Sequence, residues 1–280
     1  MYNSQRVRKA LIPAAGLGTR MQPATLAVPK ELLPVGKLPM IHYAVCEALS
    51  AGVEEIFIVI NHERKKGIQD FYYGLDREND ACFPGVQQCE QRRTFTIHFL
   101  EQPFPLGIVD AIVRSKRHLE DERFFLLMPD NVFWGARTSC QQIMAAGRDG
   151  HAILGLIEVT KENAQMFGNS GRVQLKALGG RKHEVIGLAD KSAGAFLLDG
   201  AVKVVRMCGR YLLGPEFFEE ADAIVASELA NKDEVPILKR LIERKHVLGV
   251  ELDGVLFDCG NWRGYRAANE FFWQNEILWS

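Results

Sequence analysis

RKALIPAAGLGTRMQPATLAVPKELLPV, residues Arg8–Val35, is the stretch from which both the fold and the chemistry of this chain can be inferred. Its apolar beginning, 10–12, predicts a buried strand that runs into a loop of small residues at 14–20. Small residues let backbone amides approach an anion closely, so such a loop can bind the phosphates of a nucleotide. Arg20 and Lys30 would add fixed positive charge where a phosphoryl transition state gathers negative charge. The stretch therefore predicts a nucleotide site that is also catalytic.

Two common nucleotide-binding motifs are excluded by spacing. A Walker loop needs G-x-x-x-x-G-K-[ST], and the sequence contains no such run. The dinucleotide fingerprint needs G-x-G-x-x-G/A, but Met21 stands at the third position after Gly16 and Gly18. The remaining alternative is a glycine-rich strand–helix turn that carries two surface cations.

Composition predicts an ordinary globular chain. It has 280 residues, of which 47% are hydrophobic and 25% charged, with a net charge of −1. That balance gives no electrostatic reason to expect nucleic acid or an anionic membrane as a partner. No apolar run is long enough to span a bilayer, and the N-terminus lacks the apolar core of a signal peptide. The scattered cysteines predict reduced thiols in the cytoplasm: Cys46, Cys82, Cys89, Cys140, Cys208 and Cys259.

The first half of the chain alternates short apolar runs with helical patterns. Strands are predicted at 11–14, 56–60, 95–100 and 124–128, and helices at 40–51, 64–71, 108–117 and 140–146. In the first of these helices, Ile41, Val45, Ala48 and Leu49 share one face. Such alternation predicts an α/β fold with a Rossmann-like, mainly parallel mixed sheet flanked by helices on both faces. Ligands of such sheets bind beyond the carboxyl ends of strands, where the 14–20 loop would lie.

The second half of the chain has a different pattern, in which several predicted strands precede the predicted helices. Strands are predicted at 152–159, 172–175, 185–188 and 202–206, helices at 216–228 and 235–244, then a strand pair at 247–252 and 254–258 and a helix at 262–278. We expect one domain, 1–280, with a smaller sugar-side β subregion. Its nucleotide-binding half would be 1–150, and its sugar-phosphate-binding half, with the C-terminal helix, 151–280.

The run G-x-G-T-R followed by P-K-E resembles the signature of the sugar-phosphate nucleotidylyltransferases. Within that family, AAGLGTRMQPAT and VPKELLPV look most like the bacterial uridylyltransferase branch that acts on UTP and glucose 1-phosphate. The resemblance extends from Lys9 to about Phe272 and is weakest at 77–95 and 136–185. It implies that Arg20 and Lys30 are catalytic, and that the nucleotide is bound by Ala14, Ala15, Gly16, Gly18, Thr19, Gln102 and Gly107.

The base-reading segment departs from the family pattern. Relatives often read Leu-Gly-Leu-Gly-His-Ala after the glutamine segment, whereas this chain has Val109 and Asp110 in place of the second glycine and the histidine. The resemblance implies that Gln102 hydrogen-bonds the pyrimidine edge and that Gly107 lets the base lie against backbone. Taken alone, Gln102 would be interpreted as a solvated loop residue. The substitutions leave base preference open between UTP and dTTP.

Two aspartates match the metal ligands of the family. Asp130 follows a predicted buried strand in Pro129-Asp130-Asn131, and Asp258 lies in a D-x-G segment before the last helix. Two carboxylates with phosphate oxygens and waters suit Mg²⁺, which we therefore expect as the cofactor. The alternatives are a Pro-Asp-Asn turn for Asp130 and a helix cap for Asp258.

The acceptor site is implied by weaker matches. Asp190 and Lys191 stand where relatives have Glu-Lys, and Gly209 begins a Gly-Arg-Tyr run. The resemblance implies that the acid binds sugar hydroxyls and Lys191 the sugar phosphate; the alternative is a polar turn with a solvated ion pair. Glu234, in a segment like the family's Asp-Glu-Ile-Gln-Leu, is interpreted as a solvated carboxylate at a helix entry.

The function implied is formation of UDP-glucose and pyrophosphate from UTP and glucose 1-phosphate, by in-line attack on the α-phosphorus. The alternatives are a thymidylyltransferase that uses dTTP and a regulator that binds nucleotide sugars without turnover. Family resemblance and the apolar residues of the last helix also predict a homo-oligomer, a dimer or tetramer, with packing inside the monomer as the alternative.

Overall fold

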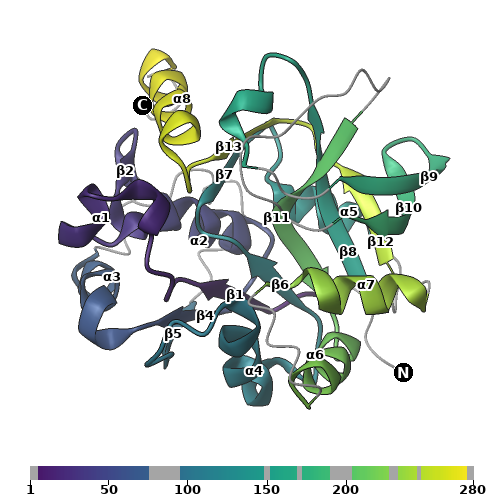
Figure 1. The fold of residues 1–280 in the computed structure, drawn as a ribbon, viewed down its shortest axis with the longest axis horizontal. Helices are drawn as coiled ribbons and strands as arrows, with labels where there is room; N and C mark the ends of the chain where they lie inside the picture. Colours follow the sequence, from purple (N-terminus) through teal and green to yellow (C-terminus); the bar gives the residue numbers. More distant parts are fainter. Residues whose placement is uncertain are drawn as a thin grey trace.

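A nine-stranded mixed sheet forms the centre of the molecule, in the order β5-β4-β1-β6-β11-β8-β12-β10-β9 (Figure 1). The computed structural model describes residues 6–75, 95–147, 152–168, 172–189, 204–226, 233–244 and 247–275. Its strands are β1 Lys9–Pro13, β2 Pro34–Val35, β3 Leu38–Pro39, β4 Glu55–Ile60, β5 Thr96–Glu101, β6 Phe124–Leu127, β7 Asn131–Trp134, β8 Ala152–Val159, β9 Val173–Gly179, β10 Lys182–Leu188, β11 Val204–Leu213, β12 Val247–Glu251 and β13 Val255–Asp258. This arrangement confirms the predicted mixed sheet.

The two halves of the chain share this sheet. β5, β4, β1 and β6 are parallel to one another, and β11 then pairs antiparallel with both β6 and β8. β12 lies parallel to β8, and β10 and β9 complete the edge in antiparallel register. The strands of the second half therefore continue the sheet that the first half begins.

Helices cover both faces of the sheet, as predicted. They are α1 Ala24–Ala27, α2 Met40–Ser50, α3 His62–Gly74, α4 Ile108–Leu119, α5 Ser139–Ala146, α6 Glu216–Ala226, α7 Val235–Glu243 and α8 Trp262–Gln274. α4, α6 and α7 lie together along the lower edge of the view in Figure 1 and pack on one face. α2, α3 and α5 pack on the other.

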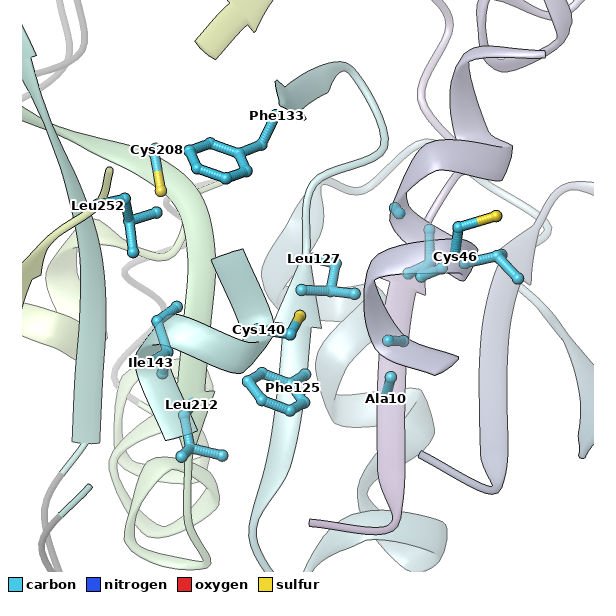
Figure 2. Close-up of a cluster of buried hydrophobic side chains, with 14 of the residues drawn as sticks. Ala10, Cys46, Phe125, Leu127, Phe133, Cys140, Ile143, Cys208, Leu212 and Leu252 are labelled. Carbon is cyan, nitrogen blue, oxygen red and sulfur yellow. The ribbon is translucent and has the colours of Figure 1, made fainter. Parts of the chain in front are cut away.

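Strand alternation explains how each face acquires its own core. Ala10 and Ile12 of β1 join the cluster under α2 and α5, whereas Leu11 between them joins the cluster under α4. Figure 2 shows part of the first cluster, where Phe125 and Leu127 of β6 meet Cys140 and Ile143 of α5. Because successive side chains point to opposite faces, a central strand must be apolar throughout, and β6 (FFLL) is.

A third cluster lies outside the main sheet. Here β7 pairs antiparallel with β13, the β2–β3 hairpin lies nearby, and α8 packs against them. Phe272 of α8 is buried and contacts the ring of Tyr43. This cluster joins the segment after the first loop to the C-terminal helix.

The structure differs from the sequence expectations in four places. β11 continues through Leu213 rather than ending at Arg206, because its residues are buried throughout. The segments at 247–252 and 254–258 do not pair with each other, since β12 joins the main sheet and β13 pairs with β7. β7 itself was not predicted, and α2 is buried on all sides rather than on one.

The cysteines that the structure describes, Cys46, Cys140, Cys208 and Cys259, are free thiols, as predicted, and all four are buried. Cys82 and Cys89 lie outside the described residues. Among the helices that the structure describes, none combines the length and the apolar character that crossing a membrane requires.

Candidate active site

The loop of small residues follows the carboxyl end of β1 in the middle of the parallel half. Ala14 and Ala15 are buried, and the Ala14 amide donates to the Val59 carbonyl at 2.7 Å. Gly16 is exposed, and a Cβ built on it would meet nothing within 4 Å. Gly18 has a φ of 67°, a conformation that favours glycine, and its carbonyl accepts from the Thr25 hydroxyl at 2.9 Å. The loop therefore has a fixed, open backbone, with the exposed Thr19 beginning the next turn.

Lys30 and Asp130 form the central contact of the site. Lys30 lies in a short 3₁₀ turn, Lys30–Leu32, and its Nζ donates to Asp130 Oδ2 at 2.6 Å. The two side chains are only 14% and 15% exposed. Arg20 is 59% exposed, and its Nη2 lies 3.7 Å from the same oxygen. Two cations predicted from the first loop thus converge on the predicted metal ligand.

Asp258 is brought to the same place by the pairing of β7 with β13, which sets Asp258 opposite Asn131. A Cβ built on Gly260 would lie 2.6 Å from Asp130 Oδ2 and 2.7 Å from Arg20 Nη2, so glycine alone fits there. The Gly260 amide donates to Asp258 Oδ1 at 3.2 Å. The two carboxylates predicted to hold a metal therefore both lie against Gly260.

These contacts explain the protonation state of Asp130. Burial by itself would raise the pKa of Asp130, but Lys30 and then Arg20 outweigh it and lower the pKa to about 2. For Lys30, burial opposes the charged form, but Asp130 and Glu31 more than compensate, and the pKa of Lys30 is raised. Asp130 is a carboxylate and Lys30 an ammonium at any ordinary pH.

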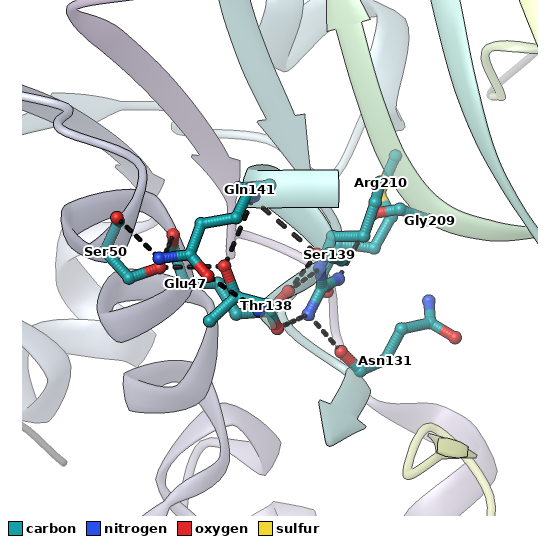
Figure 3. A network of polar contacts seen from close by, with 10 residues as sticks. Glu47, Ser50, Asn131, Thr138, Ser139, Gln141, Gly209 and Arg210 are labelled. Carbon is teal, nitrogen blue, oxygen red and sulfur yellow. Dashed lines mark hydrogen bonds and ion pairs between the residues drawn. The ribbon is translucent and has the colours of Figure 1, made fainter. Parts of the chain in front are cut away.

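A buried ion pair that sequence reasoning missed supports the Asp130 turn (Figure 3). Arg210 of β11 donates to both carboxylate oxygens of Glu47 in α2, at 2.6 and 3.1 Å. The same guanidinium donates to the Met128 carbonyl at 2.8 Å and to the Asn131 carbonyl. Arg210 therefore stabilises the turn by hydrogen bonds to backbone carbonyls on both sides of Asp130.

The signal for this pair was weak in the sequence. Arg210 belongs to the Gly-Arg-Tyr run, but nothing local connects it to Glu47, which lies 163 positions away. The Ser139 hydroxyl also donates to Glu47, and Ser139 starts the helix α5. Charged side chains are almost never fully buried without a partner. The sequence alone shows neither that Arg210 and Glu47 are buried nor that they are partners, so only the tertiary structure identifies the pair.

Gly209 lies directly against the Asp130 turn. It has a φ of 69°, and a Cβ built on it would lie 2.6 Å from Asn131 Nδ2 and 2.9 Å from Met128 Cβ. Its carbonyl accepts from the Met128 amide at 2.9 Å. Glycine is required here by both conformation and space, so the residue predicted to serve the acceptor lies beside the turn that carries Asp130, a predicted metal ligand. Asp190 and Lys191 lie outside the described residues.

Gln102 is held in one orientation by Asp110, which stands where relatives have a histidine. Its Nε2 donates to the Gly107 carbonyl at 2.9 Å and to Asp110 Oδ2 at 2.7 Å. Arg114 donates to the same carboxylate oxygen at 2.7 Å. Since both oxygens can only accept, the amide nitrogen must face them and the amide Oε1 must point elsewhere. Gln102 is buried, so its interpretation as a solvated loop residue is wrong.

Two further sequence interpretations are corrected. Asp258 does not cap α8, because Asn261 does so, accepting from the Arg263 and Gly264 amides at 3.0 Å. Glu234 is not solvated: it is buried and accepts from the Tyr211 hydroxyl at 2.9 Å. Its carboxylate acts in the packing of α7 on β11.

The donor set fits a hard divalent cation. Asp130 and Asp258 supply carboxylate oxygens at Gly260, and among the described residues no group of three or more His, Cys, Asp or Glu gathers to form a fuller metal site. A cation held there would complete its shell with substrate oxygens and water, which is how Mg²⁺ is usually bound.

Comparison with known proteins adds independent support. The family model described as "Nucleotidyl transferase" matches residues 9–275. The UTP–glucose-1-phosphate uridylyltransferase of Bacillus subtilis (strain 168) is 29% identical, covering 98% of this chain and 94% of its own. The enzyme of the same name from Mycoplasma pneumoniae is 30% identical, covering 94% and 91%.

Solved structures share the fold. A UDP-glucose pyrophosphorylase complexed with UDP-glucose has a TM-score of 0.80 at 24% identity, covering 96% of this chain and 99% of its own. A UTP-bound enzyme of the same class from Acinetobacter baumannii has a TM-score of 0.76 at 23% identity, covering 95% and 93%.

Proposed function

The chain belongs to the nucleotidyl transferase family, and on that premise we propose that it forms UDP-glucose and pyrophosphate from UTP and glucose 1-phosphate. The observation that carries the proposal is the convergence of Arg20 and Lys30 on Asp130, with Asp258 held beside them by the Gly260 amide. The two curated relatives described above carry the name of this activity. Their names support uridylyl transfer over the thymidylyl alternative and over binding without turnover.

Catalysis would rest on positioning and charge. A phosphate oxygen of glucose 1-phosphate attacks the α-phosphorus of UTP in line, the new P–O bond forms, and the bond to the β-phosphate breaks. The nucleophile is already ionised near neutral pH, so no general base is needed. Lys30 neutralises charge on the reacting phosphate, and Arg20 stabilises the leaving pyrophosphate.

The family generally depends on a divalent metal, and we propose that Asp130 and Asp258 hold Mg²⁺. When bound, the ion would withdraw charge from the triphosphate. Lys30 and Arg20 keep Asp130 ionised and ready to bind it. Arg210 and Glu47 act as positioning residues because they fix the turn that presents Asp130.

Base selection would be made by Gln102. Because Asp110 and the Gly107 carbonyl take both amide hydrogens, Oε1 is left to accept a hydrogen bond. Uracil and thymine carry an N–H at position 3, whereas cytosine carries a lone pair there. The orientation therefore favours UTP over CTP and does not by itself separate UTP from dTTP.

We propose the same division of labour for the two halves as the sequence predicted. Ala14, Ala15, Gly16, Gly18 and Thr19 of the first half bind the nucleotide phosphates. In the second half Asp190, Lys191 and Gly209 bind the sugar phosphate. We further propose action in the cytoplasm, supported by the buried free thiols, and a homo-oligomeric state.

The test is pyrophosphate release by the purified protein with Mg²⁺, offering UTP, dTTP, CTP, ATP and GTP each with glucose 1-phosphate. We expect release with UTP well above the others. Preference for dTTP would assign the protein to the thymidylyl branch with the same catalytic residues. No release with any nucleotide, including after other hexose 1-phosphates are offered, would contradict the proposal.

A further inference from the structure

Arg206 is a buried cation with few partners of its own. It lies in β11, three positions before Gly209, and its side chain is only 6% exposed. In the described part of the structure, neither Nε nor Nη1 of Arg206 has a hydrogen-bond partner, and both atoms are fully buried. Burying a charged group without hydrogen bonds is unfavourable, so its presence here needs a reason.

The guanidinium lies at the candidate active site. Its Nη1 is 3.8 Å from Asp258 Oδ2, and its Cζ lies over the ring of Phe167, 4.5 Å from the centroid. The stacking fixes the plane of the guanidinium without satisfying its nitrogens. Arg206 is therefore held in place beside a predicted metal ligand by contacts that leave Nε and Nη1 free to donate hydrogen bonds.

Asp258 does not supply the missing bonds. Its Oδ2 accepts from the Gly168 amide at 2.9 Å, and its Oδ1 accepts from the Gly260 amide at 3.2 Å. A separation of 3.8 Å is an ion pair but too long for a hydrogen bond. Two backbone amides thus hold Asp258, and Nε and Nη1 of Arg206 are left without a hydrogen-bond acceptor among the described residues.

The net charge of the site indicates what kind of ligand would bind Arg206. Three cations, Arg20, Lys30 and Arg206, surround the two carboxylates of Asp130 and Asp258. The cluster keeps one positive charge in excess even before a metal adds two more. Gly168 lies against both side chains, since a Cβ built on it would be 3.4 Å from Arg20 Nη1 and from Asp258 Oδ2. An anion would balance the excess charge.

We propose that Arg206 is a further substrate-binding residue, whose guanidinium hydrogen-bonds a phosphoryl oxygen at the Asp258 side of the site. The inference rests on the proposed function for the identity of the phosphate, which belongs either to the acceptor sugar phosphate or to the triphosphate. In both cases the chemistry is the same: a desolvated guanidinium donates charge-assisted hydrogen bonds to an anionic oxygen. We expect the fold to survive removal of the guanidinium, because its Nε and Nη1 make no hydrogen bond within the described part of the structure.

The experiment compares the wild type with Arg206→Met and Arg206→Lys. Binding of inorganic pyrophosphate and of glucose 1-phosphate is measured by calorimetry at fixed ionic strength, with Mg²⁺ and with EDTA. We expect Arg206→Met to weaken one of the two probes on the order of 10- to 100-fold, and Arg206→Lys to weaken it less. Arg181→Met, which removes an exposed arginine paired with Asp253, is the matched control and should change neither.

Thermal unfolding separates this role from a structural one. Without ligand, Arg206→Met should unfold at or above the temperature of the wild type, because a buried charge lacking hydrogen bonds is replaced by an apolar chain. With ligand, its stabilisation should be smaller than that of the wild type. A loss of stability in the free variant with the ligand-induced shift retained would overturn the proposal.

The two probes also allow failure of this inference to be distinguished from failure of the proposed function. Weakening of glucose 1-phosphate alone assigns Arg206 to the acceptor, and weakening of pyrophosphate alone assigns it to the triphosphate. Changes below twofold for both probes overturn the proposal, as does a wild type that binds neither. A wild type that binds the probes through Arg206 but releases no pyrophosphate from UTP and glucose 1-phosphate contradicts the proposed function and leaves this inference standing.

Discussion

At the scale of single residues, the Lys30–Asp130 contact fixes the charge of the site. We expect Lys30→Met to raise the pKa of Asp130, because burial would no longer be outweighed. In the wild type the pKa is depressed from 3.8 to about 2, so the stabilisation it brings is complete above pH 3.8 and is lost as pH falls through 2. The difference in free energy of unfolding should therefore be about 2 kcal/mol near neutral pH and vanish in strong acid.

Urea unfolding of both proteins between pH 7 and pH 2 measures this difference. Lys37→Met, which removes an exposed lysine near the same segment, is the control. A difference that stays constant across this range would show that Lys30 stabilises the fold by packing and not through the charge of Asp130.

Arg20 is the residue whose loss should affect turnover with the least effect on the fold. Its side chain is 59% exposed and its nearest carboxylate oxygen is 3.7 Å away, so little folding energy depends on it. We expect Arg20→Ala to lower kcat on the order of 100- to 1000-fold, the usual loss for one preorganised group. Steady-state pyrophosphate release measures it, with the exposed Arg137→Ala as control. A fall of less than about tenfold would refute the assigned role.

Asp110 should govern base discrimination through Gln102. Asp110→Asn can donate as well as accept, so the Gln102 amide is free to turn over and present its NH₂ to the base. We expect the ratio of kcat/KM for UTP over CTP to fall by about 10-fold, the value of one hydrogen bond. Arg114→Gln, which removes only the partner of Asp110, should keep most of the preference. An unchanged ratio in Asp110→Asn would exclude Asp110 from base selection.

At the scale of elements, one buried ion pair connects α2, β11 and the turn that carries Asp130. We expect Glu47→Gln to destabilise the protein by about 3–5 kcal/mol, because Arg210 is left as an uncompensated buried charge. Where the variant folds, its apparent affinity for Mg²⁺ in the reaction should fall more than its KM for glucose 1-phosphate. Equal losses in both would indicate general damage and not displacement of the Asp130 turn.

Most elements could be predicted because their signals are local. β1, β4 and β6 are short apolar runs, and the glycine-rich loop after β1 is recognised from consecutive residues. The convergence of Arg20, Lys30 and Asp130 followed from family resemblance and from the rule that ligands bind at the carboxyl ends of strands.

The remainder depended on partners far apart in the chain. β7 is only four residues long and exists because β13 pairs with it. The strand β11 was ended too early, since Arg206, Gly209 and Arg210 interrupt its apolar pattern although all are buried. Each of these residues is explained by contacts with distant parts of the chain or by the proposed site, and neither can be recognised from neighbouring residues in the sequence. The positions that break the apolar pattern of β11 therefore lie at the candidate site.

At the scale of the whole molecule, the cluster around α8 joins the C-terminal helix to the segment that follows the first loop. Phe272 packs against Gly36 and Tyr43, and Asn269 accepts from the Gly36 amide at 3.1 Å. We expect Phe272→Ala to cost about 3–5 kcal/mol, the usual loss for a buried phenylalanine. Trp273→Ala, at a side chain that is 50% exposed, should cost much less. Chemical denaturation of both variants tests this, and equal losses would mean that Trp273 is buried in an assembly.

The antiparallel register of β7 and β13 also governs the order in which a growing polypeptide can complete its catalytic centre. The loop after β1 and the neighbouring strands β4, β5 and β6 are all made before residue 128, and their contacts can form while translation continues. Asp130 gains its companion carboxylate only after residue 258 has been made, through a contact that closes more than a hundred residues of chain. If the proposed function is right, a nascent chain would be able to hold a nucleotide early but would become chemically competent only once residue 258 has been made.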